Sequence, residues 1–74
     1  MNDFASEVAI EIENARRNYP PMASAHEGFA VLAEEVCELW DEVRKKPRDR
    51  SAQRMRMELI QVAAMAQRMA EDIC

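Results

Sequence analysis

Two proline breaks divide the chain into three segments with helical patterns, and these breaks constrain the fold most. Pro20 begins the first break and Pro47 forms the second. Proline disfavours helix in the residue before it and interrupts any helix that it enters. Because the chain has one glycine and no alternating apolar runs typical of strands, we predict an all-α protein. Its helices are expected over residues 4–18, 25–46 and 52–72.

A residue that can cap a helix precedes each segment. Asp3 precedes the first helix, and Ser24 forms a Ser-x-x-Glu capping box with Glu27 at the start of the second. Ser51 or Asp49 can cap the third. A short first helix followed by two longer ones predicts a long antiparallel helical hairpin with one additional helix.

The apolar residues of the two longer helices recur at helical spacing. The expected stripes are Phe29, Leu32, Ala33, Val36, Leu39, Trp40 and Val43 in the second helix and Met55, Leu59, Val62, Ala63, Ala66, Met69 and Ile73 in the third. We expect Trp40 to pack in the core. Met57, Ile60 and Ala64 form a second apolar set, roughly opposite the main stripe of the third helix.

A helix that is apolar on two faces requires two packing partners. For the third helix, one partner is the second helix, and we expect the other to be a second subunit. Two chains would then dimerise into a four-helix bundle, as a homodimer or within a tetramer.

Length and charge restrict the class of protein. A chain of 74 residues allows a single domain, residues 1–74, with a small core that a partner subunit or a metal would stabilise. No apolar run approaches the roughly 20 residues that span a bilayer, and two cysteines without a signal peptide predict a cytoplasmic protein without membrane contact. The net charge of −4 argues against a nucleic-acid partner, including through a small helix-turn-helix fold.

Acidic residues on the two longer helices share a spacing of three. Glu35 and Glu38 project from one face of the second helix, and Glu58 and Gln61 repeat this geometry on the third. Antiparallel packing would bring these side chains together. Carboxylates at short separation resist ionisation unless a cation lies between them, and an all-oxygen ligand set suits Mg²⁺, Mn²⁺ or Ca²⁺ better than zinc.

Two simpler interpretations compete with a metal site. Several glutamates on one helix usually form a solvated face, although Glu58 lies against the apolar stripe, where a carboxylate requires a partner. An ion pair would supply that partner, and the candidate cations are Arg16, Arg17, Arg54 and Arg68. His26 lies in the capping box and is expected to serve local structure rather than catalysis.

Glu34, Glu35 and Glu38 form an EExxE motif, which ExxQ at residues 58–61 follows on the next helix. The pair resembles the EExxE and ExxD metal-binding signature of the MazG-like all-α nucleoside triphosphate pyrophosphohydrolases, with Gln61 in place of Asp. The resemblance covers residues 26–70. It implies a Mg²⁺-dependent enzyme, with Mn²⁺ as a substitute, that converts nucleoside or deoxynucleoside triphosphates to monophosphates and pyrophosphate and clears the nucleotide pool.

The resemblance also implies roles for individual residues. The expected metal ligands are Glu35, Glu38, Glu58 and Gln61. Glu34 or a neighbouring carboxylate such as Glu38 would accept a proton from the attacking water. The family motif does not fix the residues that bind phosphate; from the charge of the connector between the second and third helices, we expect Lys45, Lys46 or Arg48 to steady the outgoing pyrophosphate. Because Gln61 carries no charge, the alternative is a catalytically degenerate helical dimer that binds nucleotide or another protein.

Overall fold

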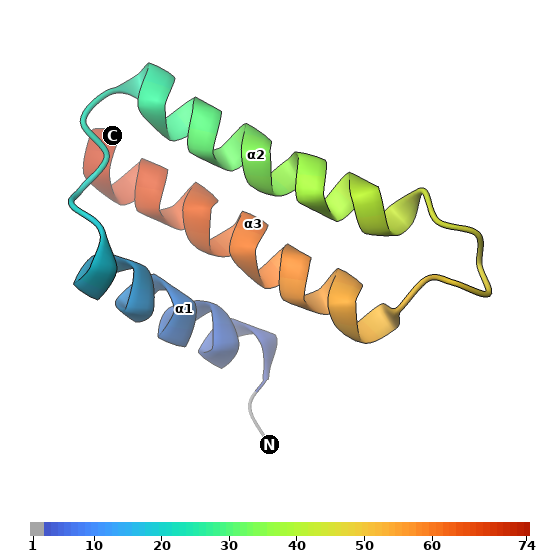
Figure 1. Ribbon diagram of the computed structural model, residues 1–74. Helices are drawn as coiled ribbons and strands as arrows, with labels where there is room; N and C mark the ends of the chain where they lie inside the picture. The colour runs from blue at the N-terminus through green and yellow to red at the C-terminus, as the bar shows by residue number, and fades with distance from the viewer. Residues whose placement is uncertain (1–2) are drawn as a thin grey trace.

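Three helices make up the computed structural model, which describes residues 3–74 (Figure 1). The helices are α1 (Phe4–Asn18), α2 (Ala25–Val43) and α3 (Ala52–Ile73), and the described residues contain no strand. α2 and α3 form an antiparallel hairpin, and α1 packs along the side of α3 that faces away from α2. The predicted all-α class and the hairpin are confirmed.

Side-chain oxygens of Asp3, Ser24 and Ser51 cap the three helices. Each accepts a hydrogen bond from the backbone N–H three residues later, at 2.8, 3.1 and 3.1 Å. Such a bond satisfies one of the free N–H groups in the first turn of a helix. Of the two residues proposed to cap α3, Ser51 does so.

α2 ends at Val43, three residues before the predicted end. Glu42 is 6% exposed, and its carboxylate accepts hydrogen bonds from the Ser51 backbone N–H at 2.8 Å and from Lys45 Nζ at 2.9 Å. The Arg50 guanidinium donates to the carbonyls of Val43 and Lys45, at 3.1 Å each. These contacts join the last turn of α2 to the residues that precede α3. The chain therefore leaves α2 before it reaches the proline.

The buried core lies mainly between α1 and α3. It consists of Val8, Ile12, Ala15, Met22, Ala64 and Met65. Ala64 is fully enclosed, and Ile60 packs against the same cluster. The second apolar face of α3 is therefore covered by α1 of the same chain, which corrects the prediction that a second subunit covers it. Met57, the third member of that set, remains exposed.

A close approach between α2 and α3 occurs at Gly28, which is buried. A Cβ atom at this position would lie 2.8 Å from Cγ of Met69 and 3.3 Å from Sδ of Met22. Since both distances are shorter than ordinary van der Waals contact, glycine allows the hairpin to close here.

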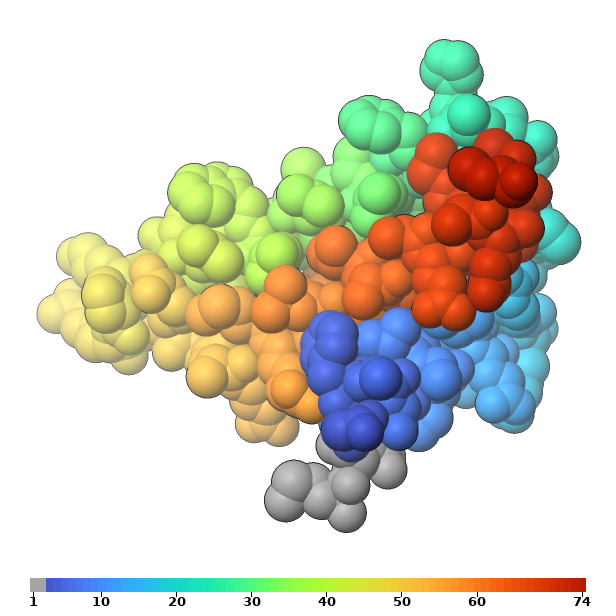
Figure 2. Space-filling view, turned by 180° about the vertical axis from the view of Figure 1, so that it is seen from behind, coloured from blue at the N-terminus to red at the C-terminus, as the bar shows by residue number. Residues whose placement is uncertain are grey.

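One side of the hairpin carries exposed apolar side chains, which we call the apolar face. They are Phe29, Val36 and Trp40 of α2, which lie within about 40° of one another around the helix at 100° per residue. Trp40 is 58% exposed, so the prediction that it packs in the core is wrong for the single chain. The helices form one layer, with extents of 40 × 30 × 19 Å, and α3 is uncovered between its neighbours in Figure 2. A single layer leaves apolar stripes without a partner.

Within residues 3–74, no helix is both long enough and apolar enough to cross a membrane.

Candidate metal centre

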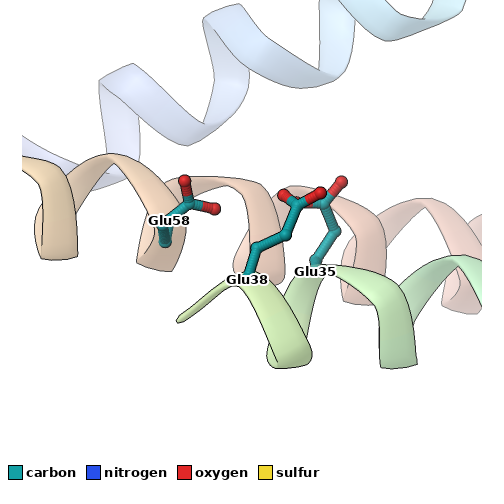
Figure 3. Close-up of side chains that lie close together, drawn as sticks. All are labelled: Glu35, Glu38 and Glu58. Atoms are coloured by element: carbon teal, nitrogen blue, oxygen red, sulfur yellow. The ribbon is translucent and has the colours of Figure 1, made fainter. Parts of the chain in front are cut away.

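Three glutamates from two helices bring their carboxylates together. Glu35 and Glu38 project from α2 toward Glu58 of α3 (Figure 3), and one oxygen from each lies within 4.8 Å of the other two. Oxygens bound to a single Mg²⁺ at about 2.1 Å are roughly 3–4 Å apart. Small side-chain movements would therefore bring all three carboxylates into contact with one ion. We call this group the carboxylate cluster.

Two atoms of the carboxylate cluster are buried without a hydrogen-bond partner, Oε2 of Glu35 and Oε2 of Glu58. Glu38 is exposed and connects the cluster to solvent. Buried polar atoms are nearly always paired, because desolvation without a partner is costly. A cation among the three side chains would satisfy both oxygens.

No ion pair within residues 3–74 connects the carboxylate cluster to an arginine or lysine. Arg16 instead contacts Glu71 and Asp72 at the end of α3, and Arg17 pairs with a glutamate of its own helix. Arg68 is 5% exposed and donates to the backbone carbonyl of Pro20 at 3.2 Å. The alternative in which a salt bridge stabilises Glu58 therefore has no support in the described geometry.

The same environment shifts the titration of the carboxylate cluster. Burial, with the neighbouring charges of Glu38 and Glu58, raises the pKa of Glu35 to about 7. Burial and the charge of Glu38 also raise the pKa of Glu58. Near neutral pH the metal-free cluster therefore retains a proton, which a divalent cation would displace.

We expect Mg²⁺ or Mn²⁺ to raise the melting temperature more at pH 8 than at pH 5.5. The folded-state pKa of Glu35, about 7, lies above its ordinary value of 4.5. The folded chain thus binds more protons than the unfolded chain between these values, and metal-free stability falls as the pH rises through this range. A free metal concentration of about 100 times Kd adds roughly 2.7 kcal/mol to the free energy of unfolding. In a chain of this size, that corresponds to a rise of about 10–20 °C in the melting temperature.

Calorimetric melting at both pH values, with either metal or EDTA, measures this difference. In EDTA, Glu35→Gln should reduce the pH dependence of the melting temperature, because it deletes the group whose pKa is about 7, while the raised pKa of Glu58 remains. Equal metal-induced shifts at both pH values would contradict the account.

The remaining predicted ligand, Gln61, lies on the α1 side of the carboxylate cluster. It lines a cavity of about 410 Å³ together with Glu34 and Glu35, which we call the α1 cavity. Glu34 is exposed and so available to solvent in this cavity. The structure thus brings together three of the four predicted ligands as carboxylates, and places Gln61 and the predicted base Glu34 beside Glu35.

A second groove, of about 300 Å³, borders the carboxylate cluster on the side of the α2–α3 connector. Glu38 and Glu58 line this connector groove, together with Lys45. Lys46 and Arg48, predicted to bind phosphate, do not line it, and both are exposed. Of the three predicted phosphate-binding residues, Lys45 alone lies beside the cluster.

The sequence suggests Arg54 as a possible ion-pair partner of Glu58 but not as a phosphate-binding residue, although it also lines the connector groove. Arg54 precedes Glu58 by four residues on α3, and residues at this spacing lie on one face of a helix. That spacing is the signal that would have identified it.

No family model matches the chain, and no curated protein or solved structure matches it either. The function is therefore argued from the geometry and chemistry of these residues.

Proposed function

We propose that the protein is a Mg²⁺-dependent nucleoside triphosphate pyrophosphohydrolase of the type that its EExxE and ExxQ motifs resemble. The observation that carries this proposal is the convergence of three carboxylates, two of them with a buried oxygen that has no partner. Water would attack the α-phosphorus. The bond between this phosphorus and the bridging oxygen would break, and pyrophosphate would leave as nucleoside monophosphate forms.

Each residue of the site has a distinct role in this proposal. Glu35, Glu38 and Glu58 would hold Mg²⁺, which supplies positive charge to the polyphosphate and lowers the pKa of a bound water. Glu34 is exposed beside Glu35 in the α1 cavity and would accept the proton of the attacking water. Gln61 would contribute an amide oxygen near the same position.

The α1 cavity suits the nucleoside part of the substrate. Its wall combines apolar side chains, including Met22 and Met65, with the polar groups of Tyr19 and Gln61. Charged side chains also line it, namely Glu11, Glu27, Glu34, Glu35 and Arg68. Its volume of about 410 Å³ lies within the range of small-molecule sites, which usually pair an apolar lining with a few polar groups. Glu35 belongs to both the cavity and the carboxylate cluster, so a nucleoside bound here would direct its phosphates toward the metal.

A second copy of the chain would cover the apolar face of the hairpin, giving the homodimer that the motif resemblance implies. At 100° per residue, Val36 and Trp40 lie about 160° around α2 from Glu38. A dimer formed through this face would leave the carboxylate cluster accessible. Large exposed apolar patches mark interaction sites more often than free surface.

Pyrophosphate release from a panel of canonical and modified nucleoside triphosphates tests the proposed reaction. We expect release with Mg²⁺ or Mn²⁺ and none with EDTA. Release that persists in EDTA would contradict the assignment.

Gln61 occupies the position where the ExxD motif has Asp. This departure favours a second candidate function, a catalytically degenerate dimer that binds nucleotide or another protein. Gln61→Asp separates the two functions, because it restores the fourth carboxylate of the motif. If the natural chain is an enzyme, the variant should be active with a lower metal requirement. Activity in the variant alone would establish the degenerate form.

A further inference from the structure

The connector groove extends from the carboxylate cluster along the start of α3. It lies between the last turns of α2 and the first turns of α3, and Glu38 and Glu58 belong to both the groove and the cluster. A polyphosphate held by a metal at the cluster would therefore have this groove on one side and the α1 cavity on the other.

Three of the six charged side chains of the groove have an ion-pair partner. Asp41 lies 3.3 Å from the guanidinium of Arg44, and Glu42 accepts hydrogen bonds from Lys45 and from the Ser51 backbone. Lys45 is thus neutralised within its own turn. Glu38 and Glu58 would be neutralised by the metal.

Arg54 is the cation of the groove without such a partner. Within residues 3–74, no carboxylate lies within ion-pair distance of its guanidinium. Its backbone N–H donates to Ser51 Oγ at 3.1 Å, which fixes Arg54 in the first turn of α3. A planar guanidinium presents paired donors that match phosphate oxygens, so it binds phosphate in two-point contacts.

We propose that the connector groove receives the pyrophosphate end of a nucleoside triphosphate, and that Arg54 binds these phosphates and selects substrates that carry them. The metal at the cluster is taken from the proposed function, while the role of Arg54 is additional to it. The substrate then has a defined direction, with its nucleoside toward α1 and its terminal phosphates toward the α2–α3 connector.

Binding of inorganic pyrophosphate in the presence of Mg²⁺ tests this assignment without requiring turnover. Calorimetric titration would compare the parent with Arg54→Gln and with Arg48→Gln, a matched control on the exposed connector outside the groove. Both variants change the net charge equally. We expect Arg54→Gln to weaken binding about tenfold or more and Arg48→Gln to weaken it less than about twofold.

Arg54→Lys, which keeps the charge and loses the paired donors, should fall between Arg54→Gln and the parent. Manganese binding, followed by electron paramagnetic resonance, should remain unchanged in every variant. Equal pyrophosphate affinities for Arg54→Gln and Arg48→Gln, with manganese still bound, would overturn the role of Arg54 alone. Absence of manganese binding in the parent would instead overturn the proposed function.

Discussion

Glu38→Gln is expected to reduce metal-dependent pyrophosphate release by about 100-fold or more. Glutamine keeps the size of the side chain but removes the negative charge from the exposed member of the carboxylate cluster. Weaker metal binding leaves less positive charge to neutralise the phosphates, and this neutralisation is how the metal would accelerate the reaction. The initial rate of release at saturating nucleotide and metal measures the effect.

The same substitution should stabilise the metal-free protein at pH 8, because the charge of Glu38 raises the pKa of both Glu35 and Glu58. Lower activity with a higher melting temperature in EDTA distinguishes a functional carboxylate from a structural one. Glu13→Gln is the matched control, since Glu13 is an exposed glutamate of α1 that pairs with Arg17. A Glu38→Gln variant with the activity of the parent would refute the assigned role.

Trp40→Glu is expected to convert the proposed dimer to a monomer, with a dissociation constant raised about 100-fold or more. Trp40 is 58% exposed on the apolar face, and large aromatic residues dominate the binding energy of such interfaces. Burying a charge there without a partner adds a desolvation penalty. Light scattering at micromolar protein concentration measures the mass.

Ile10→Glu is the control for this experiment, because Ile10 is an exposed apolar residue on α1 rather than on the apolar face. It should leave the dimer intact. A parent chain that is already monomeric at these concentrations would exclude the proposed assembly.

Local signals in the sequence were sufficient to locate the helices. The caps at Asp3, Ser24 and Ser51 depend on residues three positions apart, and each is confirmed by a hydrogen bond. The end of α2 could not be predicted in the same way. It depends on Glu42 and Arg50, whose hydrogen-bond partners lie across the connector.

The packing partners of α3 were predicted less well than its helical pattern. Periodicity identifies an apolar face but does not specify what covers it. Ile60 and Ala64 meet α1, whereas Trp40, assigned to the core, is exposed. Which apolar residues become buried depends on tertiary packing, and the apolar pattern of a single helix does not specify that packing.

The site shows the same division between local and distant information. The spacing of three between Glu35 and Glu38 placed them on one face, and antiparallel packing brought Glu58 to them. Basic residues were assigned by their nearness along the connector, so Lys46 and Arg48 were included. Arg54 is expected from the sequence only as a possible ion-pair partner of Glu58, although it lines the groove. Position along a connector without regular helical geometry says little about the direction of a side chain, whereas position on a helix face does.

Titration of the metal-free protein with Mn²⁺ shows whether the carboxylate cluster is a metal centre, on which the proposed reaction depends. Electron paramagnetic resonance of free Mn²⁺ gives the stoichiometry and affinity, and Glu58→Gln gives the contribution of α3. We expect saturable binding of Mn²⁺ at the cluster, weakened about tenfold or more by Glu58→Gln. No saturable binding at millimolar Mn²⁺, or binding that Glu58→Gln leaves unchanged, would contradict it.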